Sequence, residues 1–118
     1  MKFSVAKDQG QVVQVTIKGC LTSPDVAPPL DPLRQILGPD VYKRTVLLDM
    51  QQSNYLDSMC VGWLLGAHKR FREQGGKLVI HSLQPVASNV ISLLRLHTVF
   101  QLAGDMTKAL EMAGGEVA

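Results

Sequence analysis

The sequence predicts an α/β fold built around a mostly parallel sheet. Residues 45–49 are an almost uninterrupted apolar run, and residues 77–83 contain another, which is typical of strands buried on both faces of a sheet. A segment with helical periodicity follows each run, so strands and helices alternate along the chain. Strands joined through helices run parallel with right-handed crossovers. The chain of 118 residues is long enough for one core and predicts one domain, residues 1–118.

The N-terminal third is predicted to form a hairpin followed by one helix. Residues 3–7 and the β-branched run 12–17 are joined by a short connection containing Asp and Gly, which favours a hairpin. A proline-rich stretch follows. The helix is expected to begin late, with Asp31 as N-cap and Pro32 at the first helical position, and to end at Gly38. An earlier start within the proline-rich stretch stays open.

The later elements are separated by glycine, proline and capping residues. A long helix is predicted from Ser58 to Glu73, and Gly75-Gly76 ends it. Pro85 opens the next helix, and Asp105 caps the last one after a short strand near residues 99–102. The helix that Pro85 opens carries an apolar stripe at spacings i, i+4, i+7 and i+8, formed by Val86, Val90, Leu93 and Leu94.

Composition and charge argue against several classes of function. Twelve basic and ten acidic side chains give a net charge of +2, too small for the electrostatic footprint of a nucleic-acid-binding protein. The longest apolar run, residues 61–67, is far shorter than the roughly 20 residues of a membrane span, so no membrane insertion is expected. The N-terminus lacks the apolar stretch of a secretory signal, and two distant cysteines make no disulfide framework. A reducing cytoplasm is therefore the expected location.

Signals for an enzyme or a cofactor are weak. The sequence has no G-x-S-x-G motif, no glycine-rich phosphate-binding loop and no C-x-x-C pair. We therefore expect no cofactor, no bound metal and no small-molecule substrate. The three histidines lie on different predicted elements without ligand spacing, and a small basic cluster without interleaved aromatic residues is read as a solvated surface. These residues are His68, His81 and His97, and Lys69, Arg70 and Arg72.

The loop from Met50 to Ser58 is the strongest candidate for function. Partners of open parallel sheets meet the loops after the carboxyl ends of the strands, and this loop delivers Asp57 and Ser58 to the start of a helix. Asp or Ser at a helix start caps the free N–H groups of the first turn. A phosphate on Ser58 would occupy the same favourable place, because the helix dipole and the free N–H groups attract anions. Capping and phosphorylation are compatible, and both stay open.

Helical geometry separates two faces in the helix that follows this loop. At 100° per residue, one broad face is expected to pack on the sheet, and Met59 and Trp63 are expected to lie outside it on an exposed surface next to Ser58. Sideways packing of Trp63 against a neighbouring helix is the alternative. The inward face comprises Cys60, Val61, Leu64, Leu65, Ala67, His68 and Phe71.

Taken together, these segments resemble the STAS domain of bacterial anti-sigma-factor antagonists. The matching features, in order along nearly the whole chain, are the N-terminal strands that end at Gly19, the apolar strand Val46-Leu47-Leu48-Asp49, the loop ending Leu56-Asp57-Ser58, the helix Val61-Gly62-Trp63-Leu64-Leu65-Gly66, the glycines Gly75-Gly76 before the strand Lys77 to Ile80, the helix start at Pro85, the segment Leu96 to Phe100, and the tail Asp105-Met106-Thr107-Lys108-Ala109-Leu110.

The resemblance implies both a fold and a switch. The implied fold is a short right-handed β-α superhelix with a mixed sheet of about five strands and four helices. The implied function is binding of an anti-sigma factor that is also a serine kinase; the unphosphorylated form binds it and frees the sigma factor, and phosphorylation of Ser58 abolishes binding. The residues expected to meet this partner are Asp57, Ser58, Met59, Trp63, Thr22 and Asn54.

Departures from the family pattern leave alternatives open. Met59 and Cys60 stand where the family often has a small residue and a glycine, and Gly19-Cys20-Leu21-Thr22 lacks the acidic residue of the usual Gly-x-Leu-Asp motif. One alternative is a STAS scaffold that is not phosphorylated. Another is the STAS subunit of a lipid-transport complex, which binds an ATPase subunit. A third is a small cysteine-dependent enzyme using Cys60 and His68, which the lack of an ordered base–nucleophile motif disfavours.

Overall fold

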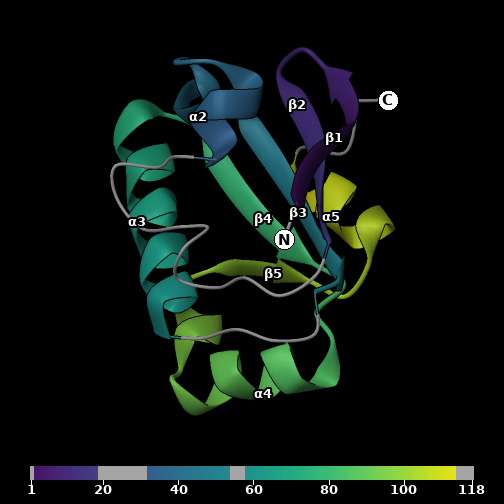
Figure 1. Ribbon diagram of the computed structural model, residues 1–118, viewed down its shortest axis with the longest axis vertical. Helices are drawn as coiled ribbons and strands as arrows, with labels where there is room; N and C mark the ends of the chain where they lie inside the picture. The colour runs from purple at the N-terminus through teal and green to yellow at the C-terminus, as the bar shows by residue number, and fades with distance from the viewer. Residues whose placement is uncertain (1, 19–31, 54–57, 114–118) are drawn as a thin grey trace.

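The computed structural model of the chain describes residues 2–18, 32–53 and 58–113 (Figure 1). These residues form a five-stranded sheet in the order β1-β2-β3-β4-β5. The β1 strand pairs antiparallel with β2, and the remaining neighbours are parallel, so the mixed sheet implied by the resemblance is confirmed. The strands are β1 (Lys2–Gln9), β2 (Val12–Lys18), β3 (Thr45–Gln52), β4 (Lys77–His81) and β5 (Gln101–Ala103).

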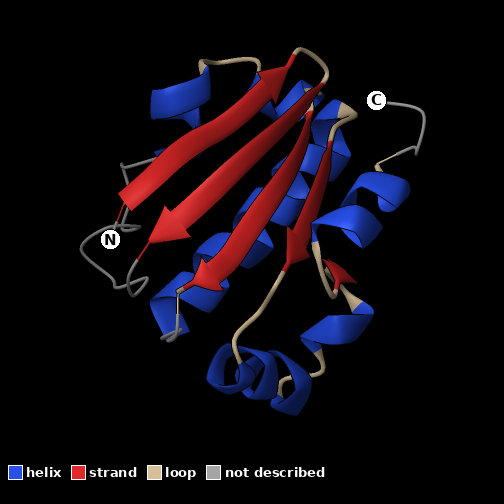
Figure 2. Ribbon diagram, turned by 90° about the vertical axis from the view of Figure 1, so that its right-hand side faces the viewer, coloured by secondary structure: helices blue, strands red, loops and turns tan. Residues whose placement is uncertain are grey.

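Helices cover both faces and one end of this sheet. Figures 1 and 2 show α3 (Ser58–Gln74) along one face, α5 (Met106–Met112) on the other, and α4 (Pro85–Leu93) at the end toward which β2, β3 and β4 point. A short α2 (Pro32–Leu37) packs beside β1 and lies at the opposite end from α4. Single turns of 3-10 helix, η1 (Val41–Lys43) and η2 (Leu96–Thr98), precede β3 and β5.

Burial on both faces explains the apolar runs of the central strands. Alternate β3 residues, Val46, Leu48 and Met50, join the main core between the sheet and α3. Leu47 points the other way, into a smaller cluster with Ala109 beneath α5. A strand covered on both sides must be apolar at consecutive positions, as the sequence predicted.

Two elements differ from the sequence-based expectation. The β3 strand continues to Gln52, although residues 50–57 were expected to be loop, because Met50 is fully buried and Gln52 still pairs with Lys18 of β2. In α4 the buried residues are Ala87 and Ile91, whereas the apolar stripe that begins at Val86 is largely exposed, with only Val90 partly buried against the core. Among the described residues, no helix is long and apolar enough to span a membrane.

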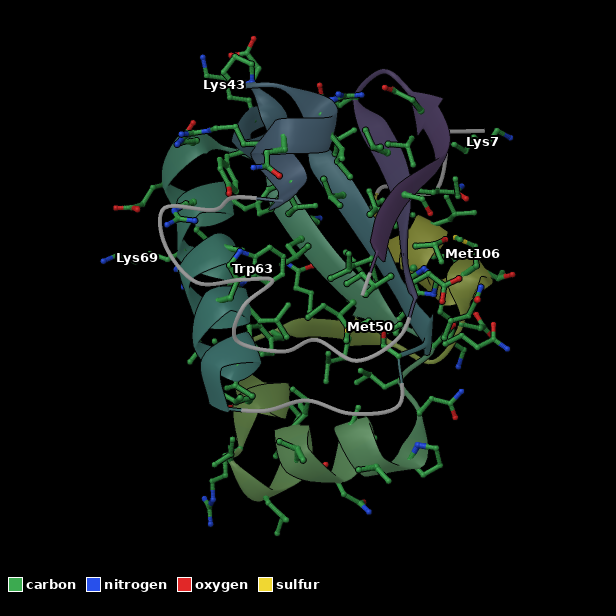
Figure 3. The ribbon with its side chains drawn as sticks, viewed as in Figure 1. Lys7, Lys43, Met50, Trp63, Lys69 and Met106 are labelled. Atoms are coloured by element: carbon green, nitrogen blue, oxygen red, sulfur yellow. The ribbon has the colours of Figure 1, made fainter. Side chains whose placement is uncertain are left out.

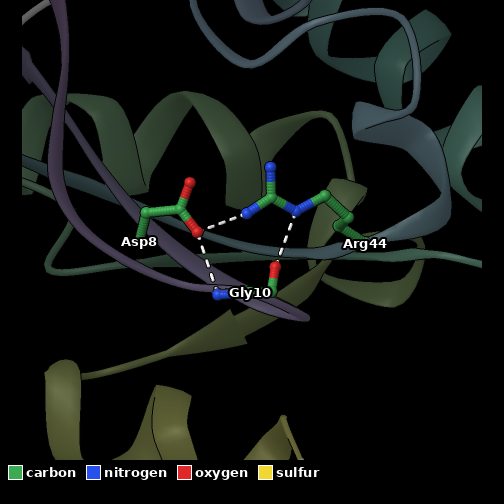
Figure 4. Close-up of polar contacts among 3 residues, drawn as sticks. All are labelled: Asp8, Gly10 and Arg44. Atoms are coloured by element: carbon green, nitrogen blue, oxygen red, sulfur yellow. Dashed lines mark hydrogen bonds and ion pairs between the residues drawn. The ribbon is translucent and has the colours of Figure 1, made fainter.

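The β1–β2 turn is fastened to the start of β3 by one arginine (Figure 4). The carboxylate of Asp8 accepts a hydrogen bond from the Gly10 amide at 2.9 Å and forms an ion pair with the Arg44 guanidinium. The Nε of Arg44 also donates to the Gly10 carbonyl at 2.7 Å. Arg44 therefore joins segments 34 to 36 positions apart in the sequence and holds the hairpin against the parallel part of the sheet.

Replacing Arg44 with methionine should lower the free energy of unfolding by about 1–2 kcal/mol, because a half-exposed ion pair and a hydrogen bond to the backbone are lost together. Urea denaturation of both proteins measures the difference. The matched control is Lys43→Met, which removes an exposed ion pair with Asp40 at 4.0 Å and should change stability by less than about 0.5 kcal/mol. Equal losses in the two variants would contradict a specific role for Arg44.

Candidate functional site

The candidate site lies at the carboxyl edge of the parallel strands, where β2 and β3 end side by side. Ser53 directly follows β3 and is fully buried. Its hydroxyl donates to the carbonyl of Ile17 in β2 at 3.1 Å, and its amide donates to the carbonyl of Met50 at 3.1 Å. Ser53 therefore turns the chain out of β3 at a fixed point and ties the ends of the two strands together.

The end of β3 is also connected to the start of α4. The carboxylate of Asp49 accepts from the amide of Gln51 at 2.9 Å, and the side-chain amide of Gln84 donates to the carbonyl of Gln51. Gln84 is the residue directly before α4. Through this contact, the start of α4 is held beside the end of β3.

The α3 helix begins at Ser58, as predicted, so Ser58 lies in the first turn, where backbone N–H groups have no partner within the helix. This places Ser58 at the same edge of the sheet as α4 (Figure 1). Of the other residues expected to meet a partner, Thr22, Asn54 and Asp57 lie outside the described residues, as do the side chains of Ser58 and Met59. Capping by Asp57 and Ser58 stays a prediction.

Trp63 does not lie on the surface, and the expectation that it is an exposed anchor is wrong. Its side chain is only 8% exposed and belongs to the main core. Figure 3 shows it on the side of α3 that faces the sheet. Trp63 lies four and eight positions before Ala67 and Phe71, which are both fully buried. It therefore lies on the same face of α3 and adds one residue to the buried stripe of that face. Leu65, which was assigned to the inward face, is instead 37% exposed.

The structure also bears on the alternative of a cysteine-dependent enzyme. The side chain of Cys60 lies outside the described residues. The ring of His68 packs edge-on against Phe100 with centroids 5.8 Å apart, and Nδ1 of His81 lies 2.9 Å from the hydroxyl of Ser82. Within the described part of the chain, no group of three or more His, Cys, Asp or Glu residues is arranged to hold a metal ion.

The sequence did not indicate that the outer face of α4 is both apolar and exposed. Val86 is 54% exposed, Leu93 83% and Leu94 56%, although all three belong to the apolar stripe of the sequence. Val99, just after η2, is also exposed. Contiguous apolar side chains on a surface are characteristic of interaction sites. The sequence of this helix and its flanks contains more apolar residues than one buried face can hold. This excess could have indicated an exposed apolar surface.

Two buried histidines are held in the neutral form. Burial lowers the pKa of His68, and the charge of Arg72 lowers it further. Burial also lowers the pKa of His81, and this effect outweighs the opposing influence of the Asp49 and Asp105 carboxylates. Nε2 of His81 is buried and has no hydrogen-bond partner among the described residues, so protonation there would add an unpaired charge.

Stability should therefore fall as the solution becomes acidic. In the unfolded chain both imidazoles take up protons near pH 6.5, whereas the folded protein resists this, so the unfolded state binds more protons below that pH. The stabilisation is complete above about pH 6.5 and is lost as pH falls toward the lowered pKa values, by at most about 1.4 kcal/mol per pH unit for each histidine. Urea denaturation between pH 7.5 and 5 measures this slope.

Substitutions identify the histidines responsible for that slope. His68→Gln and His81→Asn should each flatten the dependence of stability on pH, whereas His97→Gln, at an exposed position, should leave it unchanged. A slope that persists in the His68→Gln/His81→Asn double variant would assign it to other groups.

Comparison with known proteins is consistent with this architecture. Residues 4–109 match the sequence family described as "Mlab, STAS domain". A crystal structure from Thermotoga maritima superposes with a TM-score of 0.78 at 17% identity, covering 95% of this chain and 92% of that one. An anti-sigma factor antagonist from Mycobacterium paratuberculosis gives a TM-score of 0.70 at 20% identity, covering 95% and 94% of the two chains.

A third solved structure has the same fold at a similarly low sequence identity. The unphosphorylated form of the anti-sigma factor antagonist SpoIIAA gives a TM-score of 0.64 at 15% identity, with 94% of each chain covered. At these identities the structural matches show a common fold, while the sequence match covers most of the chain.

Proposed function

The chain belongs to the STAS domain family, and on that premise we propose that it is an anti-sigma factor antagonist whose partner is an anti-sigma factor with serine kinase activity. The unphosphorylated protein binds this partner and thereby releases the sigma factor. Phosphorylation of Ser58 ends the interaction. The supporting relatives include three solved structures of the same fold, two of which are anti-sigma factor antagonists.

The observation that supports this proposal is that α3, which begins at Ser58, starts at the same edge of the sheet as α4, whose outer face is apolar and exposed. Ser58 opens α3 at the carboxyl edge of the sheet, and α4 presents Leu93 and Leu94 to solvent at that same edge (Figure 1). A protein interface combines an apolar centre with polar groups at its rim. In place of Trp63, α4 supplies the apolar contacts, and Ser58 supplies a position at which a charge can be added.

The α4 surface should contribute measurably to partner binding. Replacing Leu93 and Leu94 together with serine should weaken binding of the anti-sigma factor by about ten- to a hundredfold, because truncating the two apolar contacts together costs about 1.4–2.8 kcal/mol. Isothermal titration calorimetry measures the affinity. The thermal midpoint should stay within about 2 °C of wild type, since both side chains are exposed.

The matched control for that experiment is Ile36→Ser. Ile36 is an exposed apolar residue on α2, at the opposite end of the sheet from α4. It should leave the affinity unchanged. If the Leu93→Ser/Leu94→Ser protein binds as tightly as wild type, the interface lies elsewhere on the molecule.

A second candidate function is kept because the matching sequence family is described as Mlab and not as an anti-sigma factor antagonist. In that case the chain would be the STAS subunit of a lipid-transport complex and would bind an ATPase subunit. Parallel titrations with the anti-sigma factor and the ATPase subunit encoded in the same genome discriminate between the two. A non-enzymatic role in the cytoplasm is part of both proposals.

A further inference from the structure

A cleft of about 320 Å³ lies along the C-terminal half of α3, away from Ser58 at the other end of the helix. It is lined by His68, Lys69, Arg72 and Glu73, which lie on successive turns of the helix. Its volume is at the lower end of the range for small-molecule sites. From the sequence, Lys69 and Arg72 were read, together with Arg70, as a solvated surface, and the cleft could not be recognised there.

The charges around the cleft are not balanced. Lys69 and Arg72 form no ion pair with any residue that the structure describes, and Glu73, although it lines the same cleft, lies beyond 4.0 Å from both of their charged groups. Figure 3 shows Lys69 extending away from the sheet. The positive charge of Arg72 reaches His68, where it disfavours protonation of the imidazole. The described lining of the cleft therefore carries two positive charges and one negative charge.

His68 gives the cleft a fixed polar wall. Its side chain is 8% exposed and its ring is held edge-on against Phe100, so the imidazole is oriented by packing. The side chains of Lys69 and Arg72 at the rim can change conformation, whereas the imidazole is held in one orientation. A buried polar group with neighbouring cations is a combination that recognises an oxyanion.

We infer that this cleft binds a small organic anion, in which a phosphate or carboxylate group contacts Lys69 and Arg72 and a short apolar body lies against α3. Arg72 offers a planar fork of donors to two oxygens, and Lys69 adds a second positive charge. The cleft accommodates a ligand of the size of phenyl phosphate or benzoate. Binding is separate from the Ser58 switch and requires no partner protein.

The test uses the full chain and two probes that share a phenyl ring. Phenyl phosphate and benzoate are titrated separately at constant ionic strength while the NMR signals of the His68 imidazole and of the α3 amides are followed. We expect saturable shifts centred on His68, Lys69 and Arg72 with at least one probe, and the tighter probe identifies the preferred head group. Shifts that do not saturate, or that are the same with sodium chloride, would overturn the proposal.

Three variants make the test specific. Lys69→Gln/Arg72→Gln should weaken binding by about tenfold or more, because charge-assisted hydrogen bonds to the anion are lost. Glu73→Gln removes the acidic group from the described part of the lining and should tighten binding. Arg95→Gln removes an exposed cation outside the cleft and should leave it unchanged. Equal weakening by Arg95→Gln and by the double variant would show that only net charge matters and would overturn a defined site.

Discussion

Gly76→Ala should be the most destabilising alanine substitution among the glycines that the structure describes, with a loss of about 3 kcal/mol or more in the free energy of unfolding. A Cβ at this position would lie 2.3 Å from the carbonyl oxygen of Tyr42, 2.5 Å from that of Arg44 and 2.9 Å from the ring of Phe71. Two of these atoms belong to the backbone and cannot rotate away. The segment before β3 would have to move from the α3–β4 turn.

That movement would break several contacts at once. The Gly76 amide donates to the Phe71 carbonyl at 2.8 Å, and the Lys77 amide donates to the Arg44 carbonyl at 3.1 Å. Tyr42 is fully buried and meets the Phe71 ring edge-on, with centroids 5.0 Å apart. Thermal denaturation should show a midpoint lower by on the order of 10–20 °C.

Other glycines in the chain provide the controls. Gly66, within α3, has no atom within 4 Å of the position that a Cβ would take, so Gly66→Ala should raise stability by up to about 1 kcal/mol through helix propensity. Gly75 also has open space, but its φ of +87° strains any other residue, and Gly75→Ala should cost about 1 kcal/mol. If the Gly76→Ala and Gly75→Ala proteins have the same free energy of unfolding, the segment around Tyr42 can move to accommodate the added methyl group at little cost.

The sequence was sufficient to predict the elements of this fold because their signals are local. Apolar runs marked the central strands, Gly38 and Gly75 marked helix ends, and Asp105 was identified as the cap of α5, where its carboxylate accepts from the Lys108 amide at 2.9 Å. The hairpin and the alternation of strands with helices predicted an α/β fold with parallel neighbours, and the mixed sheet was implied by the family resemblance. Each of these features depends on residues close together in the chain.

Which face of a helix is buried was harder to predict, because it depends on contacts with distant segments. In α4 two apolar stripes overlap, one through Val86 and Leu93 and one through Ala87 and Ile91. The structure buries the second, in which the small Ala87 side chain is completely enclosed. Helical periodicity gave more weight to the large side chains of Val86 and Leu93 than to the small side chain of Ala87. It therefore favoured the stripe that is exposed to solvent in the structure.

The start of α3 was predicted correctly, but the burial of Trp63 within it was not. The start of α3 at Ser58 agrees with the sequence, since a helix start is marked locally. The burial of Trp63 and the cleft beside His68 depend on how α3 lies on the sheet and against the segment that carries Phe100. The contact between His68 and Phe100 joins residues far apart in the chain and leaves no periodic trace in the sequence.

Ser58→Asp should abolish most partner binding while leaving the fold intact. A phosphate adds about −1.5 to −2 charges near neutral pH, and aspartate reproduces part of this change. In the free protein the charge lies in the first turn of α3, where the helix dipole and unpaired N–H groups stabilise it by about 0.3–1 kcal/mol. Thermal melts of the wild-type and variant proteins should therefore nearly coincide.

In the complex the same charge is removed from water. A charge buried in an interface without a partner costs about 3–5 kcal/mol, which corresponds to a loss of roughly two to three and a half decades in affinity for the phosphorylated form. The described residues from 82 to 104, which include α4, contain one arginine and no acidic residue, so the apolar surface beside Ser58 is suited to a partner that is itself neutral or acidic. Such a partner offers no compensation for added negative charge.

Calorimetric titration of four proteins against the anti-sigma factor isolates this effect. Ser58→Ala should bind as wild type does and should continue to bind after incubation with the kinase and ATP, whereas Ser58→Asp should bind at least about tenfold more weakly. Thr107→Asp places the same charge in the first turn of α5, on the other face of the sheet, and should leave binding unchanged. If folded Ser58→Asp binds with wild-type affinity, Ser58 is not a switch and the protein is a constitutive scaffold. That outcome would not contradict the proposed anion cleft on α3, because the test of the cleft involves no partner protein.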